Sequence, residues 1–156
     1  MRAREEFGFR PVPESDCAPL HTLNALQRDG IAAKAVRGRN SRRGVTSILH
    51  EAAEACAHSL EIHESKLPVT PEVRAVCELL GLDPWHLANE GTFVAVFPPQ
   101  LVKPALSLLR TFPQSAEACV IGEVTPRKFS TVLMTRTTGR TMPLDESAGA
   151  PLPRIC

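Results

Sequence analysis

The chain has 156 residues, enough for one domain with a real hydrophobic core, and 43% of them are hydrophobic. A formal net charge of +1 and an aromatic content of 4% argue against a nucleic-acid or anionic-membrane partner. No stretch approaches the roughly 18 unbroken apolar residues of a membrane span, and the charged opening MRAREEFGFR is not a secretory signal, so we expect a cytoplasmic protein.

The first predicted helix covers residues 15–30, with Ser15 or Asp16 as its cap and Gly30 as its end. Its apolar stripe consists of Leu20, Leu23 and Leu26. A short strand is expected over residues 31–36, and RGRNSRRG, residues 37–44, is expected to form a basic loop.

The clearest period in the sequence predicts an amphipathic helix over residues 44–58. Apolar residues recur there at helical spacing, at Val45, Ile48, Leu49, Ala52, Ala53 and Cys56. SLEIH, residues 59–63, alternates and predicts a strand. A further helix is expected within residues 70–84, with Thr70 as its N-cap, Pro71 in its first turn and Gly81 at its end.

Residues 91–97, GTFVAVF, are a candidate buried strand, and a helix over 103–112 follows with Pro104 in its first turn. Strands are expected over residues 118–124 and 130–136, and then a hairpin turn over 137–142 in which Gly139 supplies a positive φ.

The mixed order of helices and strands predicts an α+β fold, with helices layered on a largely antiparallel sheet. We expect one folded unit over residues 1–142 and a flexible tail over 143–156, because the tail is rich in small, polar and proline residues without a period.

Cys156 at the end of the tail is the first candidate for chemistry. The five cysteines form no CxxC or CxxH pair, which argues against structural zinc, and no metal ligand is predicted. From Met142 the tail could extend about 45 Å, so Cys156 could carry an activated group between sites. The alternative is a disordered end that happens to stop at a cysteine.

Two loops offer weaker candidates. Asn89 and Glu90, in the turn LANEG, could present a carboxylate as a proton acceptor or metal ligand; the alternative is a solvated turn. The basic loop that leads to Gly44 could cradle phosphate, although it lacks a known phosphate-loop spacing and could be a solvated loop. The five histidines are expected at the surface or in caps.

Several stretches together resemble the C-terminal half of the HypE family of hydrogenase-maturation carbamoyl dehydratases. They are SDCAPL, PEVRAVCELLGLDPWHLANEGTFVAVFPP, VIGEV and the terminal LPRIC, and the resemblance runs from about Glu5 to Cys156. The family belongs to the superfamily of aminoimidazole ribonucleotide synthetase and selenophosphate synthetase, which implies the fold of the aminoimidazole ribonucleotide synthetase C-terminal domain.

The resemblance implies that Cys156 accepts a carbamoyl group from a HypF-type carbamoyltransferase. ATP, with magnesium, then drives dehydration of the S-carboxamide to an S-cyanide. The cyanide passes to iron on a HypC-HypD-type scaffold complex, for [NiFe]-hydrogenase. Glu90 is implied as the catalytic acid or base, and Arg42, Gly44 and Asn89 as nucleotide-site residues.

Two departures from the family pattern qualify this expectation. The family's N-terminal ATP-binding half is absent from the sequence and would act as a separate domain. In the basic loop Arg39 stands where the family has an acidic residue, and Arg43 where it has a glycine; an arginine cannot hold magnesium. We therefore also consider a non-catalytic, truncated paralogue that binds the maturation partners, for which the unchanged PRIC terminus is the counter-argument.

Overall fold

A computed structural model describes residues 19–38, 44–89 and 91–146 of the chain. The helices are α2 (Leu20–Arg28), α3 (Gly44–Cys56), α4 (Pro71–Leu80) and α5 (Pro99–Leu109). The strands are β1 (Ala35–Gly38), β2 (Ser59–His63), β3 (Phe93–Val96), β4 (Gly122–Thr125), β5 (Val132–Thr135) and β6 (Thr141–Pro143). Three short 3-10 helices join them, η1 (Glu64–Lys66), η2 (Pro84–His86) and η3 (Pro113–Ser115).

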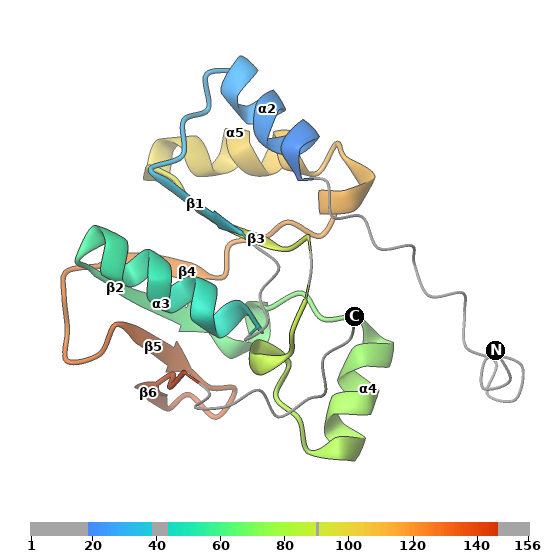
Figure 1. Cartoon of the computed structure of the whole chain (residues 1–156), viewed down its shortest axis with the longest axis vertical. Helices are drawn as coiled ribbons and strands as arrows, with labels where there is room; N and C mark the ends of the chain where they lie inside the picture. The colour runs from blue at the N-terminus through green and yellow to red at the C-terminus, as the bar shows by residue number, and fades with distance from the viewer. Residues whose placement is uncertain (1–18, 39–43, 90, 147–156) are drawn as a thin grey trace, which may run out of the picture.

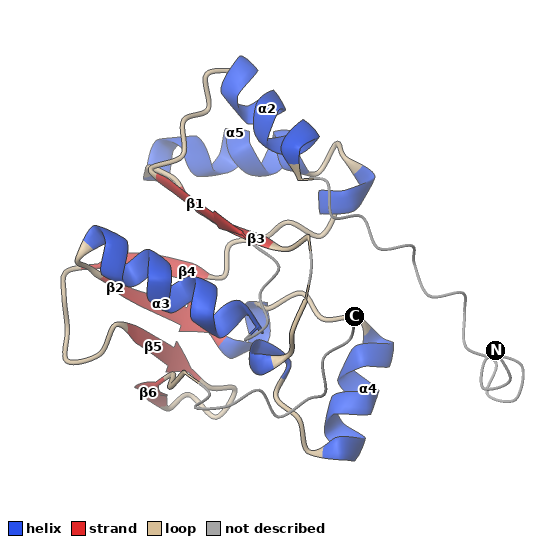
Figure 2. Ribbon diagram, in the orientation of Figure 1, coloured by secondary structure: helices blue, strands red, loops and turns tan. Residues whose placement is uncertain are grey.

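The strands form two sheets, and helices pack on them, as the α+β prediction requires (Figures 1 and 2). β1 and β3 pair antiparallel, while the larger sheet has the order β4-β2-β5-β6. Within the larger sheet β2 pairs antiparallel with β4 and parallel with β5, and β5 pairs antiparallel with β6. The fold is therefore largely antiparallel, with one parallel pair that the sequence did not indicate.

The main hydrophobic core lies between α3 and the larger sheet. It comprises Val45, Leu49, Ala52, Ala53, Leu60, Ile62, Trp85, Val132, Met134 and Leu144. A second cluster joins α2 to α5 beside the small sheet, through Leu26, Ile31, Ala105 and Leu109. In β3, Phe93 packs on the second cluster and Val94 on the first, so this strand connects the two cores.

Helices with strong local signals match their predictions. α3 buries the predicted stripe, except that Cys56 is only half-buried. α4 begins after Thr70, whose side chain accepts a hydrogen bond from Val73 N, and ends at Gly81 in the left-handed conformation. β2 spans the five residues predicted for it, and Gly139 has the expected positive φ of 81° in the β5–β6 turn.

Two helices differ from their predictions. The described part of α2 begins at Leu20, which is 67% exposed, so the N-terminal end of the predicted stripe does not reach the core. The predicted caps Ser15 and Asp16 lie outside the described residues. α5 begins at Pro99, four residues before the predicted start, so Pro104 lies in its second turn and removes one intrahelical hydrogen bond.

Three strand predictions also need correction. β1 covers residues 35–38 rather than 31–36 and so extends into the predicted basic loop. β3 is half-buried rather than buried, because it belongs to a two-stranded sheet. Pro143 lies in β6, and Leu144 is only 3% exposed, so the boundary drawn after residue 142 falls inside a strand. Most of the proposed tail, residues 147–156, lies outside the described residues.

Candidate functional site

Two of the five predicted site residues fall within the described part of the chain. Gly44 is the first residue of α3, and Asn89 lies three residues after the end of η2. Arg42, Glu90 and Cys156 lie outside the described residues, so their roles remain predictions.

The backbone of the η2 segment packs directly against Gly44. Gly44 has a φ of 72°, and a Cβ atom added there would lie 2.4 Å from the carbonyl oxygen of Trp85 and 2.8 Å from that of Leu87. Both distances are far below van der Waals contact, so only glycine allows this approach. The start of α3 and the segment from Trp85 to Leu87 therefore form one closely packed unit.

Asn89 contacts the same part of that segment. Its Nδ2 donates a hydrogen bond to the Leu87 carbonyl oxygen at 3.3 Å. Its Oδ1 is buried and, within the described residues, has no hydrogen-bond partner. The Leu87 carbonyl thus lies between Gly44 and Asn89, and the structure brings these two predicted residues together.

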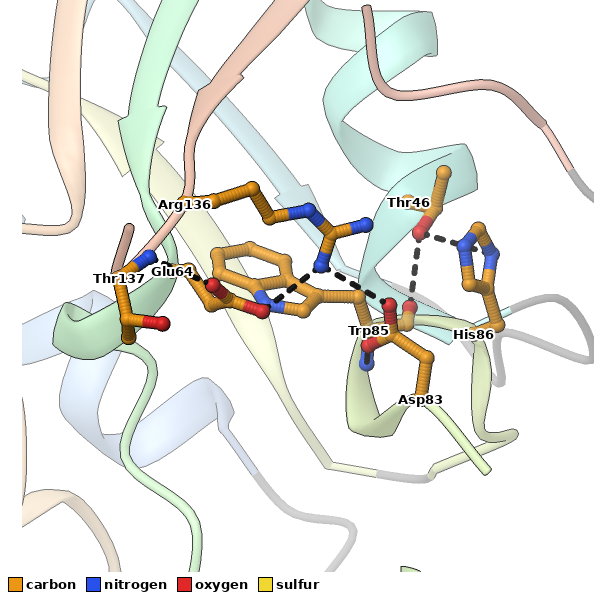
Figure 3. A network of polar contacts seen from close by, with 7 residues as sticks. All are labelled: Thr46, Glu64, Asp83, Trp85, His86, Arg136 and Thr137. Atoms are coloured by element: carbon orange, nitrogen blue, oxygen red, sulfur yellow. Dashed lines mark hydrogen bonds and ion pairs between the residues drawn. The ribbon is translucent and has the colours of Figure 1, made fainter. Parts of the chain in front are cut away.

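Thr46, in the first turn of α3, fixes η2 from the core side (Figure 3). Its hydroxyl donates to the Trp85 carbonyl oxygen at 2.9 Å and lies 3.3 Å from His86 Nδ1. A hydroxyl has one proton, so the contact with His86 requires Nδ1 to be the donor. Thr46 and Trp85 are 1% and 2% exposed, so the hydrogen bond between them is shielded from water.

Arg136 fixes η2 from the other side. Its Nη1 lies 2.7 Å from Glu64 Oε1 and 3.4 Å from Asp83 Oδ2. Asp83 in turn accepts a hydrogen bond from Trp85 N through Oδ1 at 3.0 Å, and so caps η2. This ion-pair cluster joins the β5–β6 hairpin to η1 and η2, as Figure 3 shows.

Glu64 and Arg136 each stabilise the charged form of the other. The backbone N–H of Thr137 and the Arg136 guanidinium, both hydrogen-bonded to Glu64, lower the pKa of that carboxyl below its usual value of 4.5. The pKa of Arg136 is raised, chiefly by its hydrogen bond to Glu64. Glu64 and Arg136 therefore both stay ionised at neutral pH, which keeps their ion pair intact.

Most residues of this cluster were not predicted as site residues from the sequence. Only Asp83 carried a local signal, since an aspartate directly before proline favours a capped turn. The histidine prediction is wrong for His50, whose Nε2 lies 2.6 Å from the Leu144 carbonyl oxygen and whose Nδ1 lies 2.8 Å from Thr131 Oγ1. It ties α3 to the segments on either side of the β5–β6 hairpin.

The described residues place limits on metal and membrane sites. Among them, no three histidine, cysteine, aspartate or glutamate side chains lie close enough together to hold a metal ion, and the first turn of α3 has no acidic residue. In the same part of the chain no helix has the length and apolar character needed to cross a bilayer.

Comparison with known proteins gives consistent matches. The model of the AIR synthase related protein, C-terminal domain family matches residues 2–134. Over 156 residues the chain is 40% identical to carbamoyl dehydratase HypE of Escherichia coli, covering all of this chain and 46% of that protein. The chain thus spans about half the length of the curated relatives it matches.

Solved structures give the same result. A crystal structure of E. coli HypE matches with a TM-score of 0.84 at 41% identity, covering 99% of this chain and 47% of that one. The crystal structure of the HypE-HypF complex matches with a TM-score of 0.78 at 34% identity, covering 94% of this chain and 48% of the matched chain. The crystal structure of the hydrogenase maturation protein HypE in complex with ATP matches with a TM-score of 0.79 at 27% identity, covering 96% of this chain and 47% of the matched chain.

Proposed function

Because the chain belongs to the AIR synthase related protein, C-terminal domain family, and resembles HypE over its whole length, we propose that it is the cysteine-bearing half of a carbamoyl dehydratase. Its reaction is the ATP-dependent conversion of an S-carboxamide to an S-cyanide during [NiFe]-hydrogenase maturation. The observation that carries the proposal is the 40% identity to carbamoyl dehydratase HypE over all 156 residues.

In this proposal Cys156 carries the carbamoyl group and Glu90 takes a proton from its nitrogen. Neither residue is described in the structure, but Asn89 immediately precedes Glu90 and is held by Leu87. An amide oxygen is a poor leaving group, and ATP supplies the phosphoryl group that makes it a good one. Arg42, Gly44 and Asn89 are proposed to border the nucleotide.

The residues present fit ATP better than magnesium. The start of α3 provides a helix N-terminus next to the basic residues 37–43, which suits phosphate. Magnesium is usually bound by one or two carboxylates together with substrate phosphates and water, and the first turn of α3 has no carboxylate. We propose that ligands for the metal come from the part of the relatives' length that this chain does not match, to which we assign ATP binding.

The proposed partners follow from the reaction. A HypF-type carbamoyltransferase would supply the carbamoyl group, and the solved HypE-HypF complex supports this pairing. A HypC-HypD-type iron scaffold complex would accept the cyanide, and a separate ATP-binding domain would complete the enzyme. All of these steps are proposed to take place in the cytoplasm.

Intact-mass measurement after incubation with the transferase, carbamoyl phosphate and ATP tests this function. One arm contains the chain alone, a second adds the separately expressed ATP-binding half of a HypE protein, and Cys156→Ala is the control in each. A cyano adduct that Cys156→Ala lacks is the expected result in the second arm. A carbamoyl adduct on Cys156→Ala would refute the carrier role, and no adduct in either arm would favour the non-catalytic binding module.

A further inference from the structure

The side chain of Asn89 has a fixed orientation and an unused acceptor. Its bond to the Leu87 carbonyl must be donated by Nδ2, which leaves Oδ1 as the other end of the amide. That oxygen is buried and has no partner among the described residues. A buried acceptor without a donor destabilises the fold, so a ligand that brings a donor would recover this free energy on binding.

The surrounding contacts hold this acceptor in place. Thr46 binds the Trp85 carbonyl, and Asp83 binds the Trp85 amide nitrogen. Arg136 in turn holds Asp83 through its guanidinium. With Trp85 fixed on both sides and Gly44 packed against Leu87, the chain leading to Asn89 has little freedom to turn its amide away.

The chemistry of the acceptor limits its ligand. An amide oxygen cannot bind phosphate oxygens, which are themselves acceptors at neutral pH. It needs an N–H or O–H donor. In the proposed reaction such donors come from the carboxamide on the carrier cysteine and from the adenosine part of ATP, through its adenine amino group and its ribose hydroxyls.

We propose that Asn89 Oδ1 recognises the NH₂ group of the S-carboxamide and so selects a primary amide as the substrate. This assignment rests on the proposed function and deepens it. The carboxamide is favoured over adenine because Asn89 directly precedes Glu90, the residue proposed to act on the same nitrogen.

The dehydration balances with this arrangement. The carbon–oxygen bond of R–S–C(=O)–NH₂ breaks and its oxygen leaves within phosphate derived from ATP. Both N–H protons are lost as the C≡N bond forms, one to Glu90 as the proposed base and the other to the departing phosphate. Asn89 accepts one N–H and thereby orients the amide, which leaves the other N–H for the base. Asn89 itself exchanges no proton.

Titration of the ¹⁵N-labelled chain with small probes tests the proposal by NMR. The probe is S-methyl thiocarbamate, CH₃–S–C(=O)–NH₂, and its N,N-dimethyl derivative is the matched ligand without an N–H. Adenosine forms a third arm. We expect a saturable shift of the Asn89 side-chain NH₂ signal with the first probe only.

Substitution provides a second readout. Asn89→Leu removes the acceptor at similar size and should weaken probe binding about fivefold, the equivalent of ~1 kcal/mol. Asn24→Leu makes the same change on the exposed face of α2 and should leave binding unchanged. Equal binding of the dimethyl probe, a shift with adenosine alone, or no shift with any probe would overturn the proposal.

These titrations need neither Cys156 nor ATP hydrolysis. A chain that binds the thiocarbamate but acquires no adduct on Cys156 would refute the proposed function and retain this site. A chain that forms the cyano adduct but binds the dimethyl probe equally well would support the proposed function and refute the role of Asn89.

Discussion

Replacing Gly44 with alanine should destabilise the protein more than the same change at any open glycine. Gly44 has a φ of 72°, where a Cβ atom is unfavourable, and the added atom would meet backbone atoms of Trp85, His86 and Leu87 at 2.4, 2.7 and 2.8 Å. Since these are backbone atoms rather than the ends of flexible side chains, they cannot swing aside. The η2 segment would have to move away from α3.

The loss in the free energy of unfolding has two parts. The left-handed conformation costs an alanine about 1–2 kcal/mol relative to glycine. Overpacking against a fixed neighbour typically adds about 1–3 kcal/mol. We therefore expect a total of about 2–5 kcal/mol, a large share of the ~5–15 kcal/mol that stabilises a typical domain.

The variant Gly81→Ala is the matched control, because it measures the conformational cost without the overpacking cost. Gly81 has a φ of 63°, and a Cβ atom added there would meet nothing within 4 Å, so only the conformational cost applies. Urea unfolding can be followed by the fluorescence of Trp85, the only tryptophan of the chain, which is 2% exposed in the fold. Equal losses for Gly44→Ala and Gly81→Ala would refute the close packing of η2 on α3.

Two further changes test the contacts around the hairpin. The folded-state pKa of Glu64 lies below 4.5, so its contribution to stability is complete above that pH and is lost as the pH falls through the lower folded value. Glu64→Gln should therefore flatten the acid side of the stability–pH profile measured by urea unfolding; an unchanged profile would contradict the ion pair with Arg136. His50→Phe keeps the ring but leaves the Leu144 carbonyl and the Thr131 hydroxyl unpaired, at a cost of about 1–3 kcal/mol. Amide hydrogen exchange should then accelerate at Leu144, whose N–H donates to Val132, and unchanged exchange there would contradict the role of His50.

Elements with complete local signals could be predicted from the sequence. α4 has a capping threonine, a first-turn proline and a terminal glycine within twelve residues, and all three act as predicted. α3 has an apolar period long enough to identify its buried face. Such signals act between neighbours in the chain, so no knowledge of the remaining fold is needed.

Contacts between distant segments could not be predicted in this way. Arg136 meets Glu64 across 72 positions and Asp83 across 53, and nothing in the local sequence pairs them. The parallel pairing of β2 with β5 likewise depends on the whole fold. Pro143 and Leu144 resembled the start of a tail because proline and acidic residues follow the turn, yet tertiary packing places them in a strand and in the core.

Gly44 has a packing role that its position in the sequence did not indicate. It was predicted as a nucleotide-site residue from the family resemblance, at the end of a basic loop that could cradle phosphate. In the structure the Trp85 and Leu87 carbonyls already occupy the space of its missing side chain. Packing alone therefore explains the glycine, and its presence is not an argument for nucleotide binding. The stronger sign of a ligand is Asn89 Oδ1, a buried acceptor that the described residues leave unpaired on a segment they otherwise hold firmly.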